Sequence, residues 1–306
     1  MNLMDQLGAL PAGTQVLTGE PLSQHTTFRI GGPADYFVIP GDAGALAEGI
    51  RLCRQAGVPY YVIGNGSNLL VRDGGFRGVI FSICRTMDQV VCEPCEDGTL
   101  LVTAGAGVML TRLARQVSDL GYTGFEYATG IPGTLGGAVT MNAGAYGGEI
   151  RDALTRATVL DPQGQILVLA KEDLDLSYRH SIIMEKDLIV LEAVFRFAKG
   201  DPAAIAARID ELTAARREKQ PLEYPSAGST FKRPEGYFAG KLIQDAGLKG
   251  FGVGDAQVSE KHSGFVINRG NATADQVLTL IGEVQARVMA AYGVMLEPEI
   301  RIIGSR

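Results

Sequence analysis

A glycine-rich stretch at residues 129–147 is the part of this chain best suited to bind a ligand through its backbone. It reads TGIPGTLGGAVTMNAGAYG and contains no charged residue. Glycine lets a backbone approach a ligand closely, and N–H groups exposed in this way can hold anionic oxygens or line a flat ring. A long surface loop is the alternative interpretation. Because the stretch is rich in small apolar residues, we expect it to be packed, and we take a cofactor to be what it packs on.

A second loop of this kind, Gly64–Asn68, follows an expected strand at 60–63 and reads GNGSN. Neither this loop nor Gly105-Ala106-Gly107 completes the G-x-G-x-x-G fingerprint, and no GK[ST] closes a glycine loop, so neither a Rossmann site nor a P-loop is predicted. Alone, the loop is as consistent with a tight turn as with a ligand site. Together, the two loops could hold the two ends of one elongated cofactor that carries a pyrophosphate.

Arg179 is a candidate for recognition of an anion. It stands between Tyr178 and His180 in a polar patch, SYRHS. An arginine that reaches a buried site recognises carboxylate or phosphate through two parallel hydrogen bonds. A solvated arginine at a strand end is equally consistent with this position.

Ser229 lies in the segment SAGSTFKRP, residues 226–234. Between Arg216 and Arg233 there are five basic residues and two acidic ones, which predicts a local positive site suited to a diphosphate. No G-x-S-x-G elbow surrounds Ser229, so a hydrolase is not indicated. A turn serine bonded to its own backbone is the alternative.

Two carboxylates, Glu297 and Glu299, stand at the start of an expected C-terminal strand at 300–303. Such a pair usually belongs to a solvated edge. A carboxylate at the end of an element can also enter a site as a general acid or base.

Composition limits the class of protein. The chain has 306 residues, of which 46% are hydrophobic and 20% charged, which is typical of a globular protein with two or three domains. A net charge of −6 disfavours general attraction to nucleic acid or to a membrane surface. No signal peptide and no apolar run approaching ~18 residues is found, so we expect no membrane span.

The four cysteines are few and three of them lie in one region, so no disulfide framework is indicated, and the three histidines are scattered along the chain. Cys92 and Cys95 form one CxxC, but a tetrahedral zinc site needs a second pair or nearby histidines. We therefore predict no metal and a reduced, cytoplasmic enzyme.

Apolar periodicity and turn residues predict alternating strands and helices. Thr273 is the expected N-cap of the last helix. Residues 221–234 read as irregular. We expect strands at 34–39, 60–63, 78–82, 154–160, 166–169, 188–197, 256–258, 264–267 and 300–303, a strand–turn–strand at 88–104, and helices at 42–56, 106–121, 203–219, 238–246 and 273–292.

Eight motifs occur in an order and spacing that closely resemble the bacterial UDP-N-acetylenolpyruvoylglucosamine reductases, the MurB family of peptidoglycan synthesis. The resemblance runs from about Leu17 to Gly304. The motifs are FRIGGPADYF (28–37), GNGSNLL (64–70), GIPGTLGGAVTMNAGAYGGEI (130–150), YRHS (178–181), KQP (219–221), SAGSTFKRP (226–234), GFVIN (264–268) and LEPEIRIIG (296–304).

This resemblance implies an α+β/α/β fold. An FAD-binding fold of the vanillyl-alcohol-oxidase (PCMH) type, in subdomains 1–82 and 83–199, would precede a C-terminal α+β substrate domain at 200–306, and Gly200-Asp201-Pro202 is the best linker candidate. The resemblance also implies NADPH as hydride donor and a UDP-sugar substrate, UDP-N-acetylglucosamine enolpyruvate, reduced to UDP-N-acetylmuramate. His25, the only histidine of the N-terminal half, is next to no loop assigned to flavin, so we expect non-covalent FAD.

Two alternatives stay open: another FAD oxidoreductase of the same flavin fold, and a non-catalytic flavoprotein that binds a sugar nucleotide. The presence of Arg179, Ser229 and Glu299 together argues against the second. In the family, residues at these three positions are catalytic, and a residue at the position of Lys219 contacts the substrate diphosphate.

The remaining site residues are expected on the same motifs. Substrate-binding residues are Tyr178, Lys219, Lys232 and Arg233. Cofactor-binding residues are Asn65, Gly66, Ser67, Asn68, Gly130, Ile131, Pro132, Gly133, Gly137 and Ala138.

One departure from the family concerns the segment after YRHS. Some members carry an inserted loop there, whose tyrosine closes over the substrate phosphates. Only Ile182 to Asp187 separate Ser181 from the next expected strand, so this chain resembles the shorter class without that loop. Arg233 also stands where some members have asparagine.

Overall fold

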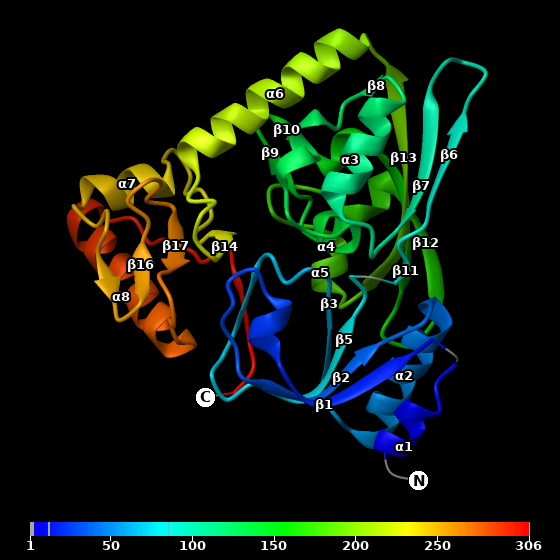
Figure 1. Cartoon of the computed structure of the whole chain (residues 1–306), viewed down its shortest axis with the longest axis horizontal. Coiled ribbons are helices and arrows are strands. Elements are labelled where there is room, and N and C mark those ends of the chain that lie inside the picture. The colour runs from blue at the N-terminus through cyan, green and yellow to red at the C-terminus, as the bar shows by residue number, and fades with distance from the viewer. Residues whose placement is uncertain (1–2, 12, 85, 306) are drawn as a thin grey trace. The chain divides into compact units, whose positions relative to one another are not determined.

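The computed structural model describes residues 3–11, 13–84 and 86–305, and the chain divides into two compact units (Figure 1). Each unit is built from three segments. Unit 1 contains Met1–Leu17, Tyr36–Asn65 and Gly78–Arg216, and unit 2 contains Thr18–Asp35, Gly66–Arg77 and Arg217–Arg306. The consecutive domains expected from the sequence, 1–82, 83–199 and 200–306, stay a prediction.

The first sheet has the strand order β1-β2-β5-β3, and helix α2 joins β2 to β3. The carboxylate of Asp42 accepts the N–H of Ala45 at 2.7 Å and caps α2, which ends at Gly57 in the left-handed region with φ 65°. Strands β3 and β5 run parallel. The bounds are β1 (Gln15–Pro21), β2 (Pro33–Ile39), α2 (Ala43–Ala56), β3 (Tyr60–Ile63) and β5 (Phe76–Ser82).

The second sheet lies in unit 1 and has the order β12-β11-β13-β7-β6, with β8 paired to the end of β13. Helix α4 packs on β13 and β7 (Figure 1). The rings of Phe125, Phe195 and Phe197 pack together, with centroids 5.1–6.1 Å apart. The bounds are β6 (Val90–Pro94), β7 (Leu100–Gly105), α3 (Leu110–Asp119), β8 (Tyr122–Thr123), α4 (Leu135–Thr140), β11 (Leu154–Leu160), β12 (Ile166–Ala170) and β13 (Ile189–Lys199).

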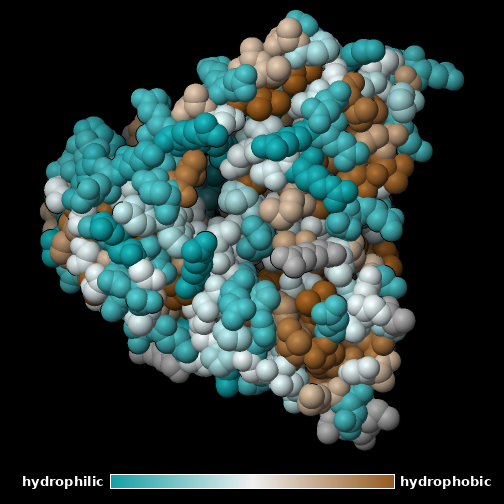
Figure 2. All heavy atoms as spheres, viewed as in Figure 1, coloured by the Kyte–Doolittle hydropathy of each residue, from teal (hydrophilic) through white to brown (hydrophobic). Residues whose placement is uncertain are grey.

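Unit 2 contains a sheet of order β14-β17-β16-β15 and a parallel pair of β18 with β4. Helix α8 begins at a capping box between Thr273 and Gln276, and its apolar side is buried. On the face shown in Figure 2, hydrophilic residues predominate around α7 and α8. The bounds are β4 (Leu69–Val71), β14 (Ser226–Ser229), α7 (Ala239–Asp245), β15 (Gly252–Val253), β16 (Ala256–Val258), β17 (Phe265–Asn268), α8 (Ala274–Tyr292) and β18 (Arg301–Ile303).

Several shorter elements and one long helix complete the described chain. Within the described residues, no helix is long and apolar enough to cross a membrane. The bounds are α1 (Leu3–Gly8), η1 (Leu22–His25), η2 (Glu126–Gly130), β9 (Gly144–Ala145), β10 (Gly148–Glu149), η3 (Ile150–Asp152), η4 (Lys171–Leu174), α5 (Ile182–Glu185) and α6 (Pro202–Lys219).

The predicted strands and helices are found with small shifts at their ends, and three segments differ more. The helix expected from 106 begins only at Leu110, because the carbonyls of Ala106 and Val108, which a first turn would need, accept the N–H groups of Gly136 and Leu135 instead. The stretch 129–147 contains helix α4, although we expected a loop throughout. The segment expected to be irregular, 221–234, contains strand β14, whose partner β17 is distant in sequence.

We predict that Asp73→Ala destabilises unit 2 by about 1–2 kcal/mol. Its two carboxylate oxygens accept the N–H groups of Ala274 and Asp275, each at 2.9 Å, so it caps α8 from a distant loop. Urea denaturation should show the loss. Asp275→Ala, in the exposed first turn of the same helix, is the control and should cost only about 0.3–0.5 kcal/mol. Equal losses would contradict a capping role for Asp73.

Candidate active site

The two glycine loops predicted to act together are in contact in unit 1. Gly64 lies so close to Thr134 that a Cβ on Gly64 would overlap its hydroxyl. The side-chain amide of Asn65 donates to the carbonyl of Pro132 at 2.6 Å. The first residues of the loop after β3 are thereby fixed to the segment that leads into α4.

Neighbouring glycines in α4 have opposite environments. A Cβ on Gly136 would lie 2.9 Å from the Cβ of Ala106, so this glycine is required for packing. A Cβ on Gly137 would meet nothing closer than the Thr134 hydroxyl at 3.9 Å, and Gly137 is exposed. Ala138 next to it is buried. Gly137 therefore belongs to a surface without side chains that a flat ligand can approach.

The side chain of a buried arginine, Arg216, forms hydrogen bonds to the backbone at the start of the glycine-rich stretch. Its guanidinium donates to the carbonyls of Gly130 and Tyr127, at 2.8 and 2.9 Å, and lies over the ring of Tyr146 at 5.2 Å. Burial lowers the pKa of this guanidinium from its ordinary value. The hydrogen bonds of its guanidinium to backbone carbonyls leave its positive charge uncompensated, so this charge favours a nearby anion.

Arg179 occupies the left-handed region of backbone space, with φ 55°. A non-glycine residue there is uncommon and usually marks a position held by its surroundings. Ser177 and His180 exchange two backbone hydrogen bonds of 3.2 Å and close the turn around it. The guanidinium donates to the carbonyl of Gly144 at 3.2 Å and lies over the Tyr178 ring. The turn therefore presents Arg179 against the glycine-rich stretch.

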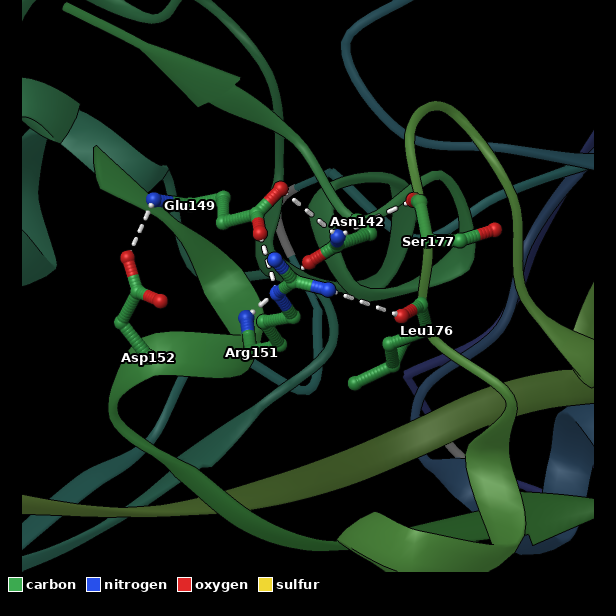
Figure 3. A network of polar contacts seen from close by, with 6 residues as sticks. All are labelled: Asn142, Glu149, Arg151, Asp152, Leu176 and Ser177. Atoms are coloured by element: carbon green, nitrogen blue, oxygen red, sulfur yellow. Dashed lines mark hydrogen bonds and ion pairs between the residues drawn. The ribbon is translucent and has the colours of Figure 1, made fainter. Parts of the chain in front are cut away.

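The buried side chain of Asn142 fixes this turn in place, as Figure 3 shows. Its amide donates to the carbonyl of Ser177 and to the carboxylate of Glu149, each at 3.0 Å, and its oxygen accepts the N–H of Arg151 at 3.0 Å. The other end of the turn is held as well, because the hydroxyl of Ser181 donates to the carbonyl of Thr140. Asn142 was not among the predicted site residues. The signal for it was a polar amide within a run of small apolar residues.

In unit 2, the backbone of Thr230 joins the end of strand β14, at Ser229, to the segment that contains Glu299. The carbonyl of Thr230 accepts the N–H of Glu299 at 2.8 Å. The hydroxyl of Thr230 accepts the N–H of Val266 at 2.9 Å, and Thr230 is buried. Both Ser229 and Glu299 are half-buried. The structure thus brings these two predicted catalytic residues onto adjacent segments.

The predicted substrate-binding residues differ in their surroundings. The Lys232 ammonium pairs with the carboxylate of Glu297 at 2.5 Å, and the Arg233 guanidinium lies 4.6 Å from the Phe238 ring centroid. Lys219 is exposed at the end of α6, and Tyr178 is exposed beside Arg179. Glu297 is therefore a partner of Lys232, whereas Glu299 is placed beside the strand of Ser229.

The remaining residues of the loop after β3, Gly66 to Asn68, belong to unit 2 and form hydrogen bonds within it. Gly66 has φ 59°, and its carbonyl accepts the N–H of Thr27 at 3.3 Å. The side-chain amide of Asn68 donates to the carbonyl of Glu299 at 3.2 Å. Ser67 between them is half-buried.

Among the described residues, no group of three or more His, Cys, Asp and Glu side chains is arranged to hold a metal ion. The four cysteines, all described, are free thiols, and burial raises the pKa of Cys53 to about 12.

Comparison with known proteins defines the class of this fold. The model of an FAD binding domain matches residues 34–170, so the N-terminal part is that of a flavoprotein. The model of the UDP-N-acetylenolpyruvoylglucosamine reductase C-terminal domain matches residues 220–303. The predicted combination of an FAD-binding fold with a C-terminal substrate domain is confirmed as the fold class.

Relatives of similar length define the family. The chain is 54% identical to the UDP-N-acetylenolpyruvoylglucosamine reductase of Lachnoclostridium phytofermentans, over 99% of this chain and 98% of that one. It is 53% identical to that of Agathobacter rectalis, over 94% of each chain. The crystal structure of the MurB reductase from Thermus caldophilus superimposes with a TM-score of 0.78 at 34% identity, over 94% of this chain and 98% of that one. This chain belongs to the UDP-N-acetylenolpyruvoylglucosamine reductase family, as the motifs predicted.

We predict that Gly137→Ala weakens FAD binding at least tenfold without loss of stability. A Cβ there meets no close protein atom, and alanine favours a helix, so only a bound cofactor would oppose it. Titration of the apoprotein with FAD, together with urea denaturation, measures both effects. Gly282→Ala, at an exposed position of α8 with nothing within 4 Å of its Cβ, is the matched control. Unchanged FAD affinity in Gly137→Ala would remove Gly137 from the cofactor site.

Proposed function

We propose that this chain is an FAD-dependent reductase that uses NADPH to convert UDP-N-acetylglucosamine enolpyruvate to UDP-N-acetylmuramate, a precursor of peptidoglycan. The observation that carries this proposal is the 54% identity, over 99% of the chain, to a reductase named for that substrate. The turn that holds Arg179 against the glycine-rich stretch supports it. The substrate is a small UDP-sugar, and we propose that the enzyme acts in the cytoplasm without a nucleic-acid or membrane partner.

The glycine loops fit a bound FAD. The surface without side chains at Gly137 suits a flat ring, and the buried charge of Arg216 suits an anionic group. When bound, FAD accepts hydride from NADPH and delivers it to the substrate. We propose that it is held without a covalent bond by the residues expected from the sequence. These are Asn65, Gly66, Ser67, Asn68, Gly130, Ile131, Pro132, Gly133, Gly137 and Ala138.

Arg179 is proposed to stabilise charge on the substrate carboxylate. Hydride addition to the vinyl CH₂ of the enolpyruvyl group leaves negative charge on the adjacent carbon, which spreads into the carboxylate. A guanidinium fixed in advance stabilises this charge without further rearrangement. The left-handed backbone of Arg179 and the hydrogen bonds of Asn142 supply that fixation.

Ser229 and Glu299 are proposed to act in the proton transfer that follows hydride addition. Ser229 delivers a proton to the carbon next to the carboxylate, since an enediolate is basic enough to take a proton from a well-placed hydroxyl. Glu299 helps to hold the enediolate as a proton-bearing partner. Tyr178, Lys219, Lys232 and Arg233 are proposed to bind the substrate, with Lys219 on its diphosphate.

Ser229→Ala is expected to keep its fold, its FAD and its rapid reduction by NADPH, because none of these uses the hydroxyl. Reoxidation by the enolpyruvyl substrate should slow by ~10²–10⁴-fold. Stopped-flow absorbance separates the two half-reactions. Ser226→Ala is the control, since the carbonyl of Ser226, not its hydroxyl, accepts the bond from Thr27. Near-normal reoxidation of Ser229→Ala would assign the proton to another donor.

Lys219→Ala should weaken substrate binding much more than it slows flavin reduction by NADPH. The side chain is exposed at the end of α6 and is assigned to the substrate diphosphate, which takes no part in the redox chemistry. Lys219→Arg keeps the charge and should recover part of the affinity. An equal loss in both half-reactions for Lys219→Ala would refute this assignment.

A further inference from the structure

The peptide groups of Glu299 are held on both sides within unit 2. Its N–H donates to the carbonyl of Thr230 at 2.8 Å, and its carbonyl accepts the side-chain amide of Asn68 at 3.2 Å. The carbonyl of Asn68 in turn accepts the N–H of Arg301 at 2.9 Å. Asn68 thus bonds to this segment with its side chain and its backbone, just before the parallel pairing of β4 with β18 begins.

The same loop is also fastened to the strand of Ser229. Thr27 donates its N–H to the carbonyl of Gly66 at 3.3 Å and its hydroxyl to the carbonyl of Ser226 at 2.7 Å. Strand β14 and the Glu299 segment are therefore both anchored to residues 66–68. One short loop sets the position of both residues that are proposed to handle the proton.

We propose that Asn68 is a positioning residue that acts on the reaction through Glu299, beyond any contact with the cofactor. This inference rests on the proposed function, since it takes Glu299 as catalytic. Loss of the amide removes the donor to the Glu299 carbonyl and lets its segment shift. A displacement of about 1 Å at a reacting group can cost on the order of 100-fold in rate. The effect falls on the step that uses Glu299, and not on reduction by NADPH.

A double-mutant cycle with Asn68→Ala and Glu299→Gln tests this coupling, with reoxidation by the enolpyruvyl substrate as the readout. Because Asn68 is also proposed to contact FAD, all rates are measured on enzyme saturated with FAD, and FAD affinity is titrated separately. In wild-type background, Asn68→Ala should then slow reoxidation by about 10–100-fold and slow reduction by NADPH by a much smaller factor. In the Glu299→Gln background, the same change should alter reoxidation by no more than about twofold, because the residue it positions is already disabled. The pH profile of reoxidation should change in Asn68→Ala as well.

Asn65→Ala is the matched control from the same loop, because its amide bonds to Pro132. Asn65→Ala should change the rate of reoxidation by the same factor in the wild-type and in the Glu299→Gln background. Additive effects of Asn68→Ala and Glu299→Gln would overturn the proposal.

Asn68→Asp keeps the shape of the side chain but lacks the amide donor, and it replaces Asn68→Ala in the cycle if the alanine variant loses FAD. Loss of FAD in both variants would overturn the proposal, because it would show that contact with the cofactor, and not the bond to Glu299, accounts for the role of Asn68. If the wild-type enzyme is reduced by NADPH but not reoxidised by the substrate, the proposed function fails instead, and the two failures are distinct.

Discussion

The buried amide of Asn142 is the interaction on which the position of Arg179 depends. It makes three hydrogen bonds, to Ser177, Glu149 and Arg151, and leaving such groups unsatisfied costs about 1–3 kcal/mol each. The turn that carries Arg179 and the end of the glycine-rich stretch must therefore form together. The residue with positive φ is held there by polar bonds around it, because none of the four residues of the turn, 177–180, is buried.

In unit 2, hydrogen bonds to backbone groups likewise fix the segments of Ser229 and Glu299. Thr230 and Asn68 hold the peptide of Glu299, and Thr27 holds the start of β14. These bonds are directional, so they place side chains more accurately than apolar contacts alone. The apolar residues of α8 then supply the stability that lets these polar contacts stay fixed.

Sequence reasoning succeeded where the physical cause is local. Helix α2 begins after Asp42 and ends at Gly57, and both capping residues act on neighbouring backbone groups, so the sequence itself marks the two ends of the helix. The family could also be predicted, because it depends on motifs in order. The partnership of Asn68 with Glu299 spans 231 residues and has no periodic signal. Asn142 and α4 were missed for a related reason, since their roles depend on tertiary contacts that a run of small residues does not encode.

The most direct test of the central claim is anaerobic mixing of the NADPH-reduced enzyme with UDP-N-acetylglucosamine enolpyruvate. We expect flavin absorbance to return, with one UDP-N-acetylmuramate formed for each NADPH consumed, as identified by mass spectrometry of the nucleotide sugar. Flavin that is reduced by NADPH, stays reduced with this substrate and recovers its absorbance only with dioxygen would contradict the account. It would leave the chain as a flavoprotein of this family with a different activity.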